Sequence, residues 1–126
     1  MLFRSLGLPG NPVSAMIAFE VFATPGLLRM LGEPAPYPSL IEVELAHHHR
    51  HTTGRVELAR ATLRPSTNGR LLVQLHSLQG SGSLPSMVDV DALVVLEGDV
   101  EHFPTGTRLQ ALLLHRMPGR TDPPFA

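Results

Sequence analysis

The chain has 126 residues, with 10 basic and 11 acidic side chains and a formal net charge of -1. This length accommodates one ordinary domain, or a small domain together with a piece of another. Nucleic acids and membranes attract clustered positive charge, so the charge gives no basis for either partner. No stretch approaches the roughly 18 to 20 uninterrupted apolar residues of a membrane span. We therefore expect a soluble protein that binds neither nucleic acid nor a membrane.

The residue types exclude several kinds of chemistry. Every basic residue is Arg, so this chain has no lysine for a Schiff base or a general base. The absence of Cys excludes disulfides, thiolate metal sites and cysteine nucleophiles. The first eight residues lack the apolar core of a signal peptide. These features predict a cytoplasmic protein.

The first predicted element is a helix from Pro12 to about Ala23. Asn11 can cap the free N–H groups of the first turn, and Pro12 suits the first helical position because its missing N–H is not needed there. The helix is apolar on nearly every side, so we expect it to need an interior or a large partner surface.

A second start signal follows the helix. Thr24 and Pro25 repeat the pattern of a cap followed by proline, and Gly32 is a natural C-terminal stop. Three prolines between residues 34 and 38 predict an extended linker. We expect residues 1–33 to form a helical arm and residues 34–38 to separate it from a second unit.

After the linker the apolar pattern changes from helical to alternating. Turn residues separate five short runs of strand character. The predicted strands are 41–45, 56–63, 71–75, 93–96 and 109–114. Residues 39–116 therefore predict a mainly β domain, a small antiparallel barrel or sandwich, and the proline-rich residues 117–126 predict a disordered tail.

The strongest local motif is the run from Leu8 to Ser14, a tight loop that leads directly into a helix. Free N–H groups and the positive end of the helix dipole at such a position can hold a phosphate or another oxyanion. A plain helix cap without a ligand accounts for the same pattern.

The sequence Gly-Leu-Pro-Gly-Asn-Pro-Val-Ser-Ala at residues 7–15, with the apolar helix after it, resembles the end of the third domain of the molybdopterin molybdenumtransferases. This family includes the E domain of gephyrin. A second match lies further along: Arg60 on a strand, Gln-Gly-Ser-Gly at 79–82, and an apolar strand that ends near Gly98 follow the order and spacing of that family's fourth domain. The resemblance extends over residues 7–114.

The resemblance implies an enzyme that takes adenylylated molybdopterin, molybdate and magnesium and yields molybdenum cofactor and AMP. In that family the active cleft lies between the third domain of one subunit and the fourth domain of the other, so a homo-oligomer is implied. The helical arm would be a remnant of the third domain. The family's acidic and lysine residues on the earlier part of that domain have no counterpart here, so the chain is expected to be inactive alone and to bind no cofactor tightly.

The matching positions imply a substrate-binding site. The residues of the loop that match the family's loop beside the cofactor precursor are Pro9, Gly10, Asn11, Pro12 and Ser14. Arg60 and Ser81 match the oxyanion side of the cleft, where a guanidinium and Gly-flanked N–H groups suit a tetrahedral dianion. A surface arginine paired across strands and a flexible Gly-Ser connection are the alternative interpretations.

The chain also departs from the family pattern. Val90-Asp91 stands where the family usually has Ala-Asn, and Asp89 stands where a basic or small residue is common. Two carboxylates beside an anion site would repel molybdate. This departure predicts weakened activity even in a complete parent protein.

A cluster of histidines lies at residues 47–51. On an extended chain His47, His49 and His51 point the same way and could bind zinc, nickel or copper. No acidic residue or Cys within the cluster completes such a site. We interpret the cluster as a solvated strand end or hairpin loop and expect no functional metal site.

Two other functions compete with the transferase fragment. A free-standing β module could bind a protein partner, but it would not need an apolar helix. A nucleic-acid-binding barrel would need aromatic platforms and a basic stripe, and the five expected strands contain no Phe, Tyr or Trp.

Overall fold

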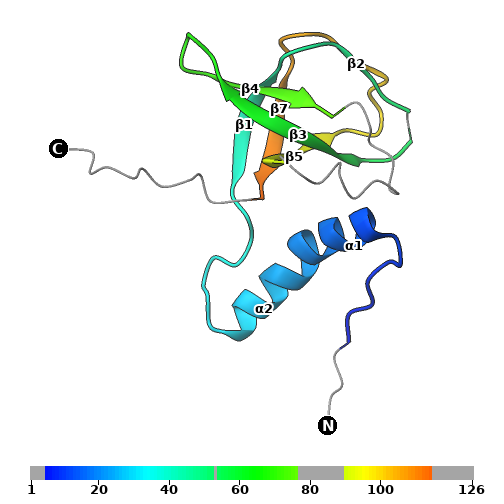
Figure 1. Ribbon diagram of the computed structural model, residues 1–126, viewed down its shortest axis with the longest axis vertical. Coiled ribbons are helices and arrows are strands. Elements are labelled where there is room, and N and C mark those ends of the chain that lie inside the picture. The colour runs from blue at the N-terminus through cyan, green and yellow to red at the C-terminus, as the bar shows by residue number, and fades with distance from the viewer. Residues whose placement is uncertain (1–4, 53, 77–89, 115–126) are drawn as a thin grey trace, which may run out of the picture.

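The chain folds into a long helix and a separate β-barrel, joined by residues 31–39, which contain a turn at Leu31 and Gly32 and bends after it (Figure 1). The computed structural model describes residues 5–52, 54–76 and 90–114. The predicted mainly β fold, a small barrel preceded by a helical arm, is confirmed. The tail predicted at 117–126 lies outside the described residues.

The helix is longer than the sequence predicts. Three segments follow each other without a break: α1 (Pro12–Ala18), a π-helical segment η1 (Phe19–Ala23) and α2 (Thr24–Met30). The prediction of a new start at Thr24 is wrong, because Thr24 has helical dihedral angles and its N–H donates to the carbonyl of Phe19. Pro25 has no N–H to donate, and the wider π turn before it accommodates the proline inside the helix.

By length and composition alone, the helix from Pro12 to Met30 could cross a membrane. A core helix of a soluble protein satisfies the same criterion, so this helix is no evidence of a membrane span. In the present structure few of its side chains are covered: Val13 and Pro25 are buried, while Phe22 is 66% exposed and Met30 is 83% exposed. The β domain therefore leaves several large apolar side chains of the helix exposed.

All five predicted strands are present and close into a barrel. They are β1 (Leu40–Leu45), β3 (Glu57–Pro65), β4 (Leu71–Leu75), β5 (Ala92–Leu96) and β7 (Arg108–Leu113), in the order β1-β4-β3-β5-β7 with β7 returning to β1. Of these pairs, β1–β4 is parallel and the others are antiparallel. A short ribbon, β2 (His49–Arg50) with β6 (His102–Phe103), adds to one end.

Alternation along the strands fills the barrel interior. On β3, Ala59 and Ala61 point inward and are fully buried, and Leu63 packs against the same cluster. The other buried residues of this cluster are Val43, Leu45, Val73, Leu75, Ala92, Val94, Leu96, Phe103, Leu109 and Ala111. All of them lie in the barrel or its ribbon, so the barrel has a complete core of its own.

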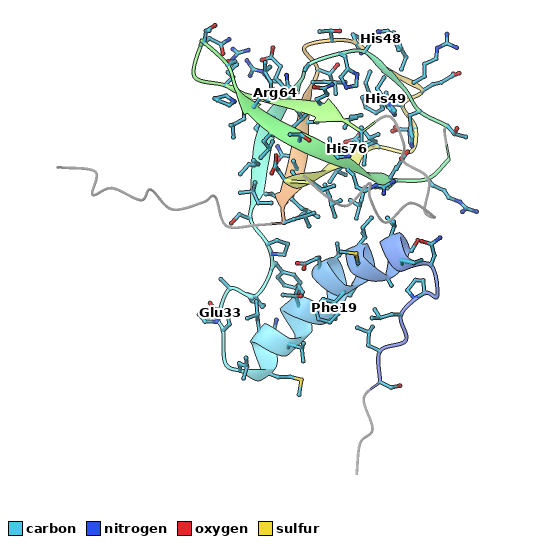
Figure 2. All side chains as sticks on the ribbon, viewed as in Figure 1. Phe19, Glu33, His48, His49, Arg64 and His76 are labelled. Atoms are coloured by element: carbon cyan, nitrogen blue, oxygen red, sulfur yellow. The ribbon has the colours of Figure 1, made fainter. Side chains whose placement is uncertain are left out.

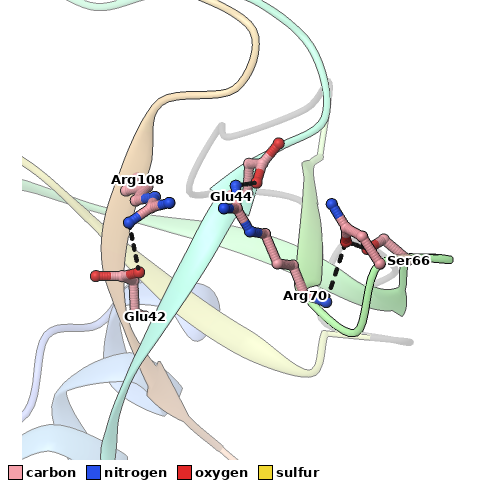
Figure 3. Close-up of polar contacts among 6 residues, drawn as sticks. Glu42, Glu44, Ser66, Arg70 and Arg108 are labelled. Carbon is pink, nitrogen blue, oxygen red and sulfur yellow. Dashed lines mark hydrogen bonds and ion pairs between the residues drawn. The ribbon is translucent and has the colours of Figure 1, made fainter.

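Charged side chains occupy the outer face of β1 (Figure 3). Arg70 donates to Glu44 at 3.0 Å, and Arg108 lies 3.7 Å from Glu42. Both pairs are partly exposed, and such pairs contribute little to stability. Glu42 and Glu44 therefore lie on the side of β1 that faces water, and Val43, between them in the sequence, faces the core.

One glycine is required by a close approach between two loops. A Cβ on Gly98 would lie 2.8 Å from the carbonyl carbon and 2.9 Å from the amide nitrogen of Arg55, and Gly54 N donates to Gly98 O across the same contact. The loop before β3 and the loop after β5 can therefore pack together only if residue 98 has no side chain.

We expect Gly98→Ala to lower the free energy of unfolding by about 1 to 3 kcal/mol, because backbone has to move to make room. Gly26→Ala is the matched control: Gly26 lies in α2, a Cβ there meets nothing within 4 Å, and alanine favours helix. Urea unfolding of both variants measures the difference. Equal stability of Gly98→Ala and wild type would contradict the proposed steric role of Gly98.

Candidate functional site

The loop before the helix is a filled helix cap. The side-chain oxygen of Asn11 accepts from Val13 N at 3.1 Å and from Ser14 N at 3.3 Å, and Ala15 N donates to Asn11 O. Pro12 has no N–H. The first donors of the helix are thus used inside the loop, and an oxyanion could reach those of Val13 and Ser14 only by displacing the Asn11 side chain.

Ser14 and the start of β3 border one cleft of about 740 Å³. Ser14, Ile17 and Phe22 line it from the helix, and Glu57 and Leu58 line it from the strand. Arg60 follows on the same strand but is not among the lining residues. The structure therefore brings the predicted loop near the strand of Arg60, although Arg60 does not line this cleft.

Arg60 is buried on the outer side of the barrel. Its neighbours Ala59 and Ala61 point into the core, so its side chain points outward, yet only 1% of the residue is exposed. Leu93, its partner on β5, is also fully buried. The alternative of a surface arginine is therefore wrong, because this patch of the outer face is covered.

Burial shapes the electrostatics of Arg60. It lowers the pKa of the guanidinium below its ordinary value, and the Glu57 carboxylate acts in the opposite direction. An arginine stays charged through such a shift. A buried cation is stable only with anionic or hydrogen-bonding partners, and Arg60 interacts with other groups of the chain.

Ser81 and the rest of the Gln-Gly-Ser-Gly run lie outside the described residues, as does Asp89. The structure therefore describes Arg60 and the loop from Pro9 to Ser14 among the predicted site residues. Sequence reasoning did not single out three neighbours of Arg60: Glu57, which acts on it electrostatically, Thr62, two residues along β3, and His76, whose N–H donates to the Arg60 carbonyl. Thr62 could have been found from the alternation along β3, which places residues 60 and 62 on the same face. His76 needed the register between β3 and β4.

The histidines at 47–51 do not converge. His47 Nε2 accepts from Leu75 N at 3.0 Å, and its Nδ1 donates to the carbonyl of His48. His51 lies elsewhere, with Nδ1 3.2 Å from Val100 O and Nε2 3.3 Å from Glu57. The interpretation of the whole cluster as a solvated loop is wrong for His51, which is buried. Within the described ranges no three His, Asp or Glu side chains could hold a metal ion.

Burial also changes the pKa of His49, a histidine between His47 and His51. The pKa of His49 is lowered, first by desolvation and further by the neighbouring histidines, while Glu57 raises it. Glu57 is therefore the common counter-charge of this region: it lies beside His51 and acts electrostatically on both His49 and Arg60.

One family model, described as "MoeA C-terminal region (domain IV)", matches residues 42–114. The chain belongs to the MoeA C-terminal family. The molybdopterin molybdenumtransferase of Bacillus subtilis is 27% identical over 117 residues, which is 93% of this chain and 27% of that protein. Molybdopterin molybdenumtransferase 2 of Mycobacterium tuberculosis is 32% identical over 103 residues, 82% of this chain and 25% of that protein.

Solved structures agree with the family assignment. The crystal structure of the molybdopterin biosynthesis moeA protein from Pyrococcus horikoshii OT3 matches with a TM-score of 0.65 and 25% identity, over 82% of this chain and 26% of that one. A molybdenum cofactor biosynthesis protein from Pyrococcus furiosus matches with a TM-score of 0.63 and 27% identity. The chain thus spans about a quarter of the length of the curated relatives it matches.

Within this MoeA domain, Asp91 has a structural contact. Its carboxylate accepts from Leu63 N at 2.9 Å, Asp91 N donates to Ala61 O, and Leu114 N donates to Asp91 O. The side chain thus satisfies a β3 amide beyond the last paired residues of β3 and β5, Ala61 and Ala92. The Asp91 side chain therefore has a structural role that does not involve molybdate.

We expect Asp91→Ala to lower the free energy of unfolding by about 1 to 2 kcal/mol, because the Leu63 amide loses its acceptor. Asp91→Asn keeps a side-chain oxygen and should retain most of the stability. Thermal unfolding of the two variants checks this. If the Ala and Asn variants are equally stable, the hydrogen bond to Leu63 contributes nothing.

Proposed function

We propose that this chain is the C-terminal portion of an enzyme of molybdenum cofactor biosynthesis, one that inserts molybdate into adenylylated molybdopterin in the cytoplasm. The order of features carries the proposal: a capped Pro-Gly-Asn-Pro loop leads into an apolar helix, and a MoeA-type barrel with a buried arginine on its outer face follows. Relatives that match most of this chain have the name molybdopterin molybdenumtransferase.

The proposed substrates are molybdopterin and molybdate, with magnesium implied by the resemblance. Among the residues that the structure describes, no group of three acidic or histidine side chains is arranged to hold a metal ion. These residues do not fit a magnesium site of their own. Any magnesium would have to be bound with residues outside the described ranges, in this chain or in further parts of the enzyme.

The exposed helix favours the fragment over the free-standing module. An independent binding module has no use for a helix with large apolar side chains on most of its surface, because uncovered apolar area of this kind promotes aggregation. In a helix that belongs to a larger domain, the apolar side chains are covered by other parts of that domain. The exposure of Phe22 and Met30 is what this second case predicts.

The chain alone is expected to show no molybdate insertion, because it has only a part of the proposed cleft. Purified protein would be mixed with adenylylated molybdopterin, molybdate and magnesium, and AMP release would be measured. The full-length Bacillus subtilis relative is the positive control. Turnover at about 1 per second or faster, as in ordinary enzymes, would show that the chain is a complete catalyst and not a portion of one.

Arg60 is proposed to attract the tetrahedral dianion. We expect molybdate to bind on the order of millimolar, worth about 4 kcal/mol, because the side chain is covered and the anion must displace what covers it. Arg60→Ala should abolish binding, and Glu57→Gln should strengthen it because an opposing negative charge is removed. Calorimetry with molybdate, tungstate and sulfate measures both. Undiminished binding in Arg60→Ala would show that Arg60 has no such role.

Self-association through the helix is proposed as the way this chain covers its apolar side chains. Each such side chain that becomes buried contributes about 1.5 to 3 kcal/mol, and two copies pair most simply about a two-fold axis. Light scattering at micromolar concentration should report a dimer or larger. Replacing Phe19 and Phe22 by Ser should shift the protein toward monomer, whereas Tyr37→Ser, at an exposed linker residue, should not. A monomeric wild-type chain with an ordered helix would contradict the proposal.

A further inference from the structure

The cleft between the helix and β3 combines apolar walls with a carboxylate. Ile17 and Phe22 line it from the helix, and Val56 and Leu58 line it at the start of β3. Glu57 lies between these last two residues and is the acidic side chain among the described residues that line the cleft. Figure 2 shows the side chains of the helix and those of the barrel on its two sides. Its volume of about 740 Å³ is in the range of small-molecule sites.

Buried His51 holds the Glu57 carboxylate by one of its oxygens. The His51 side chain is 3% exposed, and its backbone N–H donates to Glu101 O at 2.9 Å. Its Nδ1 lies 3.2 Å from the carbonyl oxygen of Val100, which can only accept, so Nδ1 has a proton. Its Nε2 lies 3.3 Å from Glu57 Oε2. Two unprotonated acceptors would repel each other there, so the ring nitrogen or the carboxylate has a proton, and in either case Oε2 is engaged.

The Glu57 carboxylate keeps accepting capacity toward the cleft. Its side chain is 37% exposed, in contrast to the 3% of His51. A carboxylate has two oxygens and about four lone-pair positions, so a contact at Oε2 leaves most of this capacity unused. Beside apolar walls, such an acceptor gains most from a ligand with two parallel N–H donors.

A pterin ring offers this arrangement. One edge of the ring has an amino group beside a ring N–H, and its flat faces suit apolar and aromatic walls such as Ile17 and Phe22. An arginine side chain offers the same pair of donors, but Arg55 lines this cleft as well and would repel a second guanidinium. The neutral pterin ring is not repelled. Charge complementarity therefore favours a pterin over an arginine-containing peptide.

We propose that Glu57 recognises the amino edge of the pterin ring of the substrate, with the ring between the helix and β3, and that His51 positions Glu57. The proposal rests on the proposed function, which names molybdopterin as a substrate. It assigns two opposite charges of β3 to two parts of that substrate set, Glu57 to the pterin and Arg60 to the oxyanion. Glu57 is then a specificity-determining residue, because a ring without the amino group loses one of its two bonds to the carboxylate.

Fluorescence titration of the full 126-residue chain with pterin tests this. Lumazine is the matched control ligand, because it has an oxo group in place of the amino group. Pterin should bind about tenfold or more tightly than lumazine, since the oxo group places an acceptor against the Glu57 carboxylate. In NMR spectra the ring signals of His51 should shift with pterin, which locates the probe in this cleft.

Glu57→Gln should weaken pterin binding about tenfold to a hundredfold, because the charged acceptor is lost. The same variant is expected to strengthen molybdate binding, so the two effects have opposite signs. Glu101→Gln is the matched control: it removes an exposed carboxylate that does not line the cleft, and it should bind pterin like wild type.

The positioning role of His51 has its own pair of variants. His51→Leu removes the contact to Glu57 and should reduce the preference for pterin over lumazine, whereas His51→Gln keeps a donor and should retain most of it. A merely structural role would weaken both ligands equally and leave their ratio unchanged. The Glu57 variants test the site even where a substitution of buried His51 disturbs the fold.

The outcomes separate this inference from the proposed function. Equal binding of pterin and lumazine, or of pterin by wild type and Glu57→Gln, would overturn the inference. Glu57-dependent binding of N-acetylarginine amide without binding of pterin would also overturn it and make the cleft a docking site for an arginine side chain. If pterin does not bind while molybdate binds through Arg60, the inference is wrong and the proposed function stands. If pterin binds through Glu57 and molybdate does not bind, the inference stands and the proposed role of Arg60 is wrong.

Discussion

Closure of a narrow five-stranded barrel determines most of what this chain can do. Five strands enclose little volume, so the interior accepts only limited side-chain bulk. The alanines meet this limit: Ala59, Ala61, Ala92 and Ala111 are fully buried, and Ala61 faces Ala92 across one strand pair while Ala111 faces Val94 across the next. Branched residues on β1 and β4 fill the remaining space. Because the inside is full, any group with chemistry has to be on the outer face or in the loops.

The outer face is where β3 becomes unusual. An outward side chain on a small barrel is normally in water, as Glu42 and Arg108 are (Figure 3). Arg60 points outward and is nevertheless buried, beside an apolar partner on β5 and opposite His76, the residue that follows β4. In such surroundings electrostatic interactions are stronger than in water. A buried cation needs compensation, and Arg60 interacts with other groups of the chain. This placement is what the proposed anion-binding role of Arg60 rests on.

Sequence reasoning found the elements that depend on short-range patterns. Alternation located the five strands because each has one buried face, and Asn11 with Pro12 located the helix start because capping is a local interaction. It failed where distant residues decide. Thr24 and Pro25 are a sound start signal alone, but the helix before them continues through a π turn. The burial of Arg60 depends on its surroundings in space. His47 and His51 diverge because only His49 and Arg50, between them, form a regular strand. The cluster as a whole is therefore not an extended chain.

The two parts of the chain differ in how completely they are stabilised. The barrel contains its whole core between Val43 and Ala111, so it needs nothing from the helix. The helix has Pro25 and Gly26 in its interior, and both disfavour helix in an unsupported peptide. Isolated helices of such length are marginal in water even with good helix formers, because tertiary packing provides most helical stability. This helix buries little besides Val13 and Pro25. An ordered helix at residues 12–30 therefore requires a surface that covers Phe19, Phe22 and Met30, and the barrel, already complete, does not provide it.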